Sequence, residues 1–176
     1  MDKQAIRADI KNAMSQIPEA EKRHRSASLW QYLERRDIFQ KADIILMYWS
    51  MPDEMFTHEA VLRWCESKTI LLPVIKGDFL TIVPFTGTQS LRKNTRWNVY
   101  EPQGTTYTDL QAIELAMVPG VAFDKECHRL GRGKGYYDSF LPLLNAYKTW
   151  VCFDFQILDR LPIEPHDIPM DEVIAG

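Results

Sequence analysis

Apolar residues in the first 40 positions recur at the spacing of helices. One stripe runs over Ile6–Met14, and a second runs over Ala27–Leu33. Residues three or four positions apart share one face of a helix, so each stripe predicts an amphipathic helix. Pro18 lies between the stripes, and proline is accepted in the first turn of a helix. We therefore expect two helices before the first strand.

Short, continuous apolar runs then indicate buried strands. The runs at 69–75 and 79–85 are separated only by Lys76, Gly77 and Asp78, which predicts an antiparallel hairpin. Thr57 suits the N-cap of a helix that would lie between the apolar runs at 43–49 and 69–75. Strands that alternate with helices indicate an α/β layer architecture with a mixed sheet, and ligands in such folds bind beyond the carboxyl ends of strands. The other expected strands span 43–49, 115–119 and 149–155. The strand at 115–119 is expected to lead straight into a glycine-rich run.

Composition narrows the classes of function. A chain of 176 residues, 45% of them hydrophobic, suits one compact domain over residues 1–176. The net charge of −3 and the pI near 5.8 argue against a nucleic-acid surface, which is usually basic. No apolar run is long enough to cross a bilayer, and we expect no secretory leader. The expected partners are small molecules, with neither nucleic acid nor a membrane among them.

The three cysteines, Cys65, Cys127 and Cys152, are odd in number and widely spaced. They therefore predict neither a disulfide framework nor a metal site. A reduced, cytoplasmic protein is the simplest interpretation, and we favour a monomer.

The run Arg129–Asp138 reads Arg-Leu-Gly-Arg-Gly-Lys-Gly-Tyr-Tyr-Asp. Glycine lets backbone N–H groups close on a bulky anion and accepts positive φ angles, while arginine and lysine add charge-assisted donors. A helix predicted from Tyr136 to about Tyr147, with a kink or an early restart at Pro142, would aim its N-terminus at bound phosphate. The spacing fits neither the Walker pattern nor the dinucleotide-binding pattern. The alternative is a surface turn with solvated charges.

This run resembles the signature of the 5-formyltetrahydrofolate cyclo-ligase family, also called 5,10-methenyltetrahydrofolate synthetase. The shape Pro-Gly-x-x-Phe-Asp at 119–124, followed by the run at 129–138, is specific to that family and its near relatives. Cys127 departs from the pattern, because many members have glycine there. Matching features span nearly the whole chain: Lys3 and Arg7, the segment Trp49–Glu54 with Thr57, the segment Trp97–Pro102, Phe155–Gln156, and Asp167.

The resemblance implies a three-layer α/β fold, with a mostly parallel central sheet and helices on both faces. It also implies a set of site residues. ATP would be bound by Lys3, Arg7, Arg129, Leu130, Gly131, Arg132, Gly133, Lys134, Gly135, Tyr136 and Tyr137. The folate would be bound by Trp49, Glu54, Trp97, Arg132, Gly133, Lys134, Gly135 and Tyr136. Arg132 and Lys134 would act in catalysis, and Asp138 and Asp167 would hold Mg²⁺.

Several of these residues also have ordinary structural interpretations. Lys3 and Arg7 are i,i+4 neighbours, which suits a solvated helix face. Asp138 in the first turn of a helix would be stabilised by the helix dipole. Trp97 is equally compatible with packing in a core and with stacking on a flat ligand ring.

The resemblance implies Mg²⁺- and ATP-dependent conversion of 5-formyltetrahydrofolate to 5,10-methenyltetrahydrofolate, with release of ADP and phosphate. Transfer of the γ-phosphoryl group to the formyl oxygen would give an iminium phosphate, and N10 would then close the ring. Two alternatives remain open. One is an ATP-dependent phosphotransferase with another acceptor, and the other is a folate- or nucleotide-binding protein without turnover.

Overall fold

Two helices open the chain, as predicted. The computed structural model describes residues 2–165 and 167–176. Helix α1 spans Lys3–Gln16 and helix α2 spans Glu19–Glu34, with Pro18 immediately before α2. Asp2 caps α1, because its carboxylate accepts hydrogen bonds from two backbone N–H groups of the first turn. No described helix is long and apolar enough to span a membrane.

The central sheet has six strands in the order β11-β9-β6-β1-β2-β3. Every neighbouring pair is parallel except β2 and β3, which form the predicted hairpin around Gly77. The mostly parallel, mixed sheet is therefore confirmed, and β11 is an addition to the predicted strands. The strands are β1 Ile44–Leu46, β2 Thr69–Lys76, β3 Phe79–Pro84, β6 Leu115–Met117, β9 Tyr147–Cys152 and β11 Glu172–Ala175.

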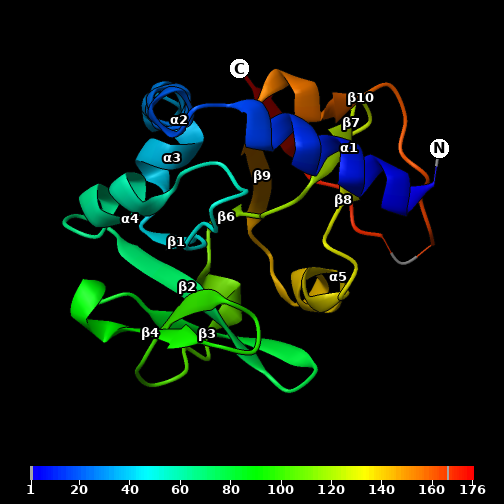
Figure 1. Ribbon diagram of the computed structural model, residues 1–176. Coiled ribbons are helices and arrows are strands. Elements are labelled where there is room, and N and C mark those ends of the chain that lie inside the picture. The colour runs from blue at the N-terminus through cyan, green and yellow to red at the C-terminus, as the bar shows by residue number, and fades with distance from the viewer. Residues whose placement is uncertain (1, 166) are drawn as a thin grey trace.

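Helices cover both faces of this sheet, which confirms the layered α/β fold (Figure 1). Successive strand residues point to opposite faces. Ile45 and Met47 therefore pack on the side of α2, α3 (Asp37–Lys41) and α4 (His58–Trp64). Leu46 packs on the other side, against α5 (Tyr136–Phe140) and the 3-10 helix η3 (Leu141–Leu143). The sheet therefore lies between two apolar cores.

A second, three-stranded sheet in the order β10-β7-β8 carries the glycine run. Its strands are β7 Ala122–Asp124, β8 Arg129–Leu130 and β10 Ile157–Leu158. Ile6 and Ile10 of α1 pack on it, and Figure 1 shows α1 lying across these strands. The prediction that residues 115–119 lead straight into the glycine run is wrong, because β7 and the turn after it lie between them, and β8 is already the start of the run.

Two further strands, β4 (Leu91–Asn94) and β5 (Val99–Pro102), form a separate hairpin that apolar runs did not predict. Trp97 lies in its turn, beside Asn98, whose φ is +54°. Exposed Arg92 and Lys93 hide the strand from a search for apolar runs. Three further 3-10 helices, besides η3, lie in the connections: η1 Thr88–Ser90, η2 Leu110–Ala112 and η4 Asp154–Gln156.

The helix predicted from Tyr136 to about Tyr147 is wrong in length. Helix α5 ends at Phe140, and η3 follows it with Pro142 inside. Proline has no N–H group to donate to the preceding turn, so the α-helix cannot continue through it. The chain is then free to enter β9 at Tyr147, two residues before the predicted strand begins.

The turn between β7 and β8 is organised by the buried carboxylate of Asp124. It accepts hydrogen bonds from the backbone N–H groups of Glu126, His128 and Leu161. Burial alone would raise the pKa of Asp124, but these bonds outweigh it and lower the pKa. Cys127, where many family members have glycine, adopts a φ of +63°. A left-handed backbone at a non-glycine residue costs about 1–2 kcal/mol, which explains why glycine suits this position.

Candidate active site

One cavity of about 650 Å³ contains every residue that the sequence analysis assigned to a ligand. This volume lies in the range of small-molecule sites. The walls come from α1, the loop after β1, the β2–β3 and β4–β5 hairpins, and the glycine run. The assigned lining residues are Lys3, Arg7, Trp49, Glu54, Trp97, Arg129, Leu130, Gly131, Arg132, Gly133, Lys134, Gly135, Tyr136, Tyr137, Asp138 and Asp167.

The loop that follows β1 is held closed by Ser50 and Thr57. The backbone N–H of Ser50 donates to the Thr57 hydroxyl at 2.9 Å, and the backbone N–H of Thr57 donates to the Ser50 hydroxyl at 3.0 Å. The Thr57 hydroxyl in turn donates to the carbonyl of Tyr48 at 2.7 Å. Thr57 does stand at the N-cap position of α4, but its side chain closes the loop and makes no capping hydrogen bond.

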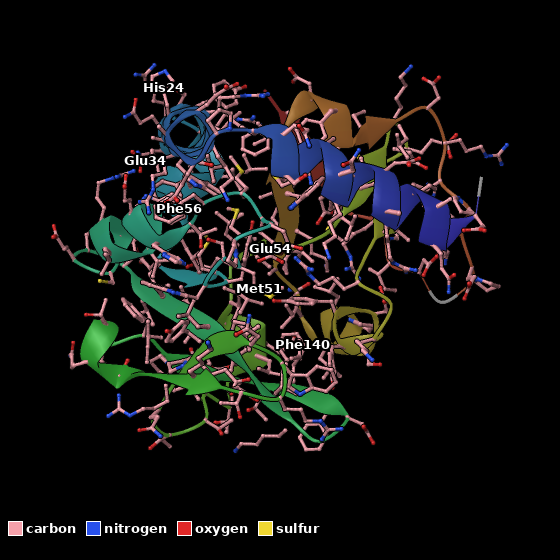
Figure 2. The ribbon with its side chains drawn as sticks, viewed as in Figure 1. His24, Glu34, Met51, Glu54, Phe56 and Phe140 are labelled. Carbon is pink, nitrogen blue, oxygen red and sulfur yellow. The ribbon has the colours of Figure 1, made fainter. Side chains whose placement is uncertain are left out.

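Helix α2 fixes the same loop from outside. Trp30 donates its indole N–H to the carbonyl of Phe56 at 2.7 Å, and the Ser26 hydroxyl accepts from the N–H of Phe56 at 3.0 Å. Glu54 therefore projects from a pinned loop. Figure 2 shows Glu54 and Met51 in the central part of the molecule, between α1 and the β2–β3 hairpin.

Glu54 is an almost buried carboxylate with two kinds of partner. One oxygen accepts from the backbone N–H of Met51 at 2.9 Å, and the other accepts from the Arg132 guanidinium at 3.1 and 3.2 Å. Burial raises the pKa of Glu54, and the charge of Arg132 and these hydrogen bonds offset the rise only in part. Arg132 thus favours the ionised form of this carboxylate at the cavity wall.

The glycine run wraps around Arg7 of α1. The Arg7 Nε–H donates to the carbonyl of Gly131 at 2.8 Å. Gly133 has a φ of +88° and Gly135 has a φ of +70°, both in the left-handed region that favours glycine. A Cβ atom at Gly133 would lie 3.2 Å from Nη2 of Arg7, a tight contact that would require the Arg7 side chain to shift. The run therefore presents backbone rather than side chains to the cavity at these positions.

Lys3 occupies the end of the cavity formed by the N-terminus of α1. Its ammonium group donates to the carboxylates of Glu164 and Asp167, each at 3.1 Å. Burial alone would lower the pKa of Lys3, but these two carboxylates raise it. The predicted contact of Lys3 and Arg7 with a ligand fits this position, because both side chains line the cavity and neither lies on a fully solvated face.

Asp138 pairs with Arg129 at 2.5 Å, and the Arg129 side chain is only 3% exposed. The second oxygen of Asp138 takes no hydrogen bond from the part of the chain that the structure describes. Asp167 lines the same cavity. Among the described residues, no group of three or more His, Cys, Asp or Glu side chains is arranged to hold a metal ion. This donor set fits Mg²⁺ shared with nucleotide phosphates, since Mg²⁺ commonly takes one or two carboxylates beside phosphates and water.

Two tryptophans stand on different walls. Trp49 stacks on His58 with ring centroids 3.9 Å apart and packs partly into the core. Trp97 meets Tyr136 edge to face at 5.9 Å, and the Lys134 ammonium lies 5.3 Å from its ring centre. The structure therefore favours a place for Trp97 in the cavity wall over a place in the core.

Sequence reasoning missed part of the lining. Ile75 and Leu80 come from the β2–β3 hairpin, whose inward-facing residues give no chemical signal in the sequence. Tyr48 precedes Trp49 and was assigned only to a buried strand. Outside this lining, sequence reasoning also missed that Asp53, in the segment around Glu54, pairs with Arg132. The other missed lining residues are Met51, Pro73, Val99, Tyr100, Pro119, Gly120 and Glu164.

A model of the 5-formyltetrahydrofolate cyclo-ligase family matches residues 1–176. The chain belongs to this family. The 5-formyltetrahydrofolate cyclo-ligase of Mus musculus is 28% identical over 188 residues, covering 98% of this chain and 92% of the mouse chain. The family member of the same name from Escherichia coli K12 is 30% identical over 146 residues, covering 76% and 78%. The family inferred from the glycine run is thereby confirmed.

Solved structures of cyclo-ligase family members agree with the fold. The NMR structure of Aquifex aeolicus 5,10-methenyltetrahydrofolate synthetase superposes with a TM-score of 0.88 at 28% identity, covering 99% of this chain and 90% of that chain. A 5,10-methenyltetrahydrofolate synthetase from Mycoplasma pneumoniae shares the fold, with a TM-score of 0.80 at 23% identity and coverage of 99% and 98%. The roles of individual residues in this chain stay predictions.

Proposed function

We propose that this chain catalyses the ATP-dependent cyclisation of 5-formyltetrahydrofolate to 5,10-methenyltetrahydrofolate, with release of ADP and phosphate. The observation that carries the proposal is the cavity itself. It joins an almost buried carboxylate, Glu54, to a glycine run with three cationic side chains, so that a pterin and a polyphosphate can meet inside one site. We place the activity in one domain of residues 1–176 and expect a monomer in the cytoplasm.

The chemistry explains why ATP is consumed. The formyl oxygen is a poor leaving group, so N10 of the folate cannot displace it directly. The formyl oxygen attacks the γ-phosphorus, ADP leaves, and the formyl carbon becomes part of an iminium phosphate. N10 then bonds to that carbon, its proton is lost, and the C–O bond breaks to release phosphate. The formyl oxygen leaves with the phosphate, and methenyltetrahydrofolate remains.

Phosphoryl transfer depends mainly on alignment and on neutralisation of charge. Glu54 accepts hydrogen bonds from pterin N–H groups and so aims the formyl group. Gly131–Gly135 line the cavity, and their backbone N–H groups, together with the Lys134 ammonium, would stabilise the phosphates. No side-chain nucleophile is required. Tyr137 adds a buried hydroxyl at the cavity wall that has no partner within the described residues, which leaves it a hydrogen bond to give to a ligand.

Asp138 and Asp167 would hold Mg²⁺ in this site. When bound with ATP, the ion neutralises phosphate charge and orients the polyphosphate. Arg129 positions Asp138 by its ion pair, and Lys3 contacts Asp167 in the same way. These two cations therefore fix the carboxylates in the wall of the cavity.

A single assay tests the reaction. The purified protein, incubated with 5-formyltetrahydrofolate, ATP and Mg²⁺, is expected to produce the methenyl chromophore and ADP in equal amounts. The control omits ATP and should give no enzymatic signal. ADP formation only with a different acceptor would support the phosphotransferase alternative. Folate binding without ATP consumption would support a binding protein.

Glu54→Gln tests the pterin anchor. Replacing a charged acceptor with a neutral one of the same shape costs about 1.5–3 kcal/mol, so folate affinity should fall roughly ten- to a hundredfold. Wild-type affinity should also weaken as the pH falls through the pKa of Glu54, which burial raises above its usual range. Calorimetric titration across pH checks both effects, and the Gln variant should lack this pH dependence. Equal loss of ATP and folate affinity would contradict the assignment.

A further inference from the structure

The Arg132 guanidinium is held by two acidic side chains. Its Nη1 and Nη2 atoms donate to the two oxygens of Asp53 at 3.0 and 2.8 Å. Its Nε and Nη2 atoms donate to one oxygen of Glu54 at 3.2 and 3.1 Å. Four of the five N–H donors of Arg132 therefore face carboxylates, and without leaving them Arg132 can offer a phosphate only the second N–H of Nη1.

Asp53 contacts Arg132 from outside the main cavity. It does not line the main cavity; instead it lines a separate cavity of about 140 Å³ together with Lys11 and Gln156. Arg132 lies between the two cavities and borders both. The side chain of the site that Asp53 contacts is thus Arg132, whereas Glu54 reaches the ligand space itself.

We propose that Asp53 is a positioning residue that docks Arg132 on Glu54, and that release of this docked guanidinium couples the binding of the polyphosphate to the binding of the pterin. The proposal rests on the proposed function. In the docked position, Arg132 occupies the Glu54 oxygen that would receive a pterin N–H group. In the released position, Arg132 is available to phosphate and Glu54 is available to the pterin.

Both ligands consequently favour the released position. The first ligand to bind bears the cost of breaking the contacts of Arg132, and the second ligand finds them already broken. The coupling is reciprocal, because each ligand must raise the affinity for the other by the same factor. The planar, two-pronged contact with Asp53 stabilises the docked position, so removing it should weaken the coupling. The flanking Gly131 and Gly133 give the backbone around Arg132 the freedom to follow this movement.

Titration calorimetry with the β,γ-imido analogue of ATP and Mg²⁺, with and without saturating 5-formyltetrahydrofolate, tests the proposal. In the wild-type protein, the folate should raise affinity for the analogue by at least about fivefold. Asp53→Asn should bind the analogue alone about two- to fivefold more tightly, on the scale of a partly exposed ion pair. Its affinity in the presence of folate should stay near the wild-type value, so the coupling factor falls. Asp53→Glu should restore the coupling.

An Arg132→Ala background separates this role from a general effect of charge. Asp53→Asn added to Arg132→Ala should change neither affinity, because Asp53 acts through Arg132. A gain in analogue affinity that persists there would overturn the proposal, as would a parallel loss of both affinities in Asp53→Asn alone. Independent binding of the two ligands to the wild-type protein would reject the coupling but keep the proposed function. Failure of the wild-type protein to bind either ligand would reject both.

Discussion

Gly133→Val should abolish measurable ATP binding while the core stays folded. Gly133 has a φ of +88°, and a β-branched residue resists this conformation. A Cβ atom would also lie 3.2 Å from the Arg7 guanidinium, which holds the carbonyl of Gly131. The run would move and lose several contacts with phosphate. Two hydrogen bonds to a charged group, at about 1.5–3 kcal/mol each, correspond to at least about a hundredfold in affinity.

Gly77→Val is a matched control for backbone strain. Gly77 has a φ of +62° in the β2–β3 turn, and a Cβ atom there would meet no atom within 4 Å. Both variants should lower the free energy of unfolding, because both force valine into a positive φ, at a cost of about 1–3 kcal/mol. Only Gly133→Val should lose ATP affinity in calorimetric titration. Unchanged ATP affinity in Gly133→Val would refute the assignment of the glycine run to phosphate binding.

Much of the central sheet could be predicted because buried parallel strands appear in the sequence as continuous apolar runs. The runs around Ile45, Leu71 and Ala116 lie in β1, β2 and β6, and their residues point into two separate cores. Strands without such a run escaped. The β4–β5 hairpin carries exposed charges, and β7 and β8 lie within the signature motif, where glycine and charged residues mask a strand.

The members of the site could be predicted, but their contacts with one another could not. Sequence motifs identified Glu54 and Arg132 separately and assigned one to the pterin and the other mainly to phosphate. The structure joins them directly, across 78 positions of sequence. No local pattern encodes a pair so distant, because it depends on how the loop after β1 meets the glycine run. Arg132→Ala should therefore disturb the folate site as well as the use of ATP.

The pairing of Asp138 is a second contact of this kind. The sequence analysis gives Asp138 two roles, as a ligand of Mg²⁺ and as an acid stabilised by a helix dipole. The structure adds its ion pair with Arg129, a side chain that is only 3% exposed. Arg129 Nε has no hydrogen-bond partner among the described residues, so Asp138 carries most of the compensation for this buried charge.

Asp138→Asn should therefore reduce both stability and turnover. Removing one partner of a buried ion pair leaves the other charge uncompensated, at a cost of about 3 kcal/mol. Loss of a charged ligand for Mg²⁺ should lower kcat by about a hundredfold or more, since it removes stabilisation of the transferring phosphoryl group. Denaturant unfolding measures the first effect. The second is measured by turnover as a function of Mg²⁺ concentration, well below the unfolding temperature.

Asp167→Asn separates the two roles of Asp138. Asp167 contacts Lys3, whose side chain is 23% exposed, so its loss should cost much less stability than the loss of the Arg129 partner. If both carboxylates hold Mg²⁺, both variants should need more Mg²⁺ for half-maximal turnover, although only Asp138→Asn unfolds easily. A wild-type rate for Asp138→Asn at limiting Mg²⁺ would contradict the assignment of Asp138 as a metal ligand. Asp138 would then contribute only to stability, through its ion pair with Arg129.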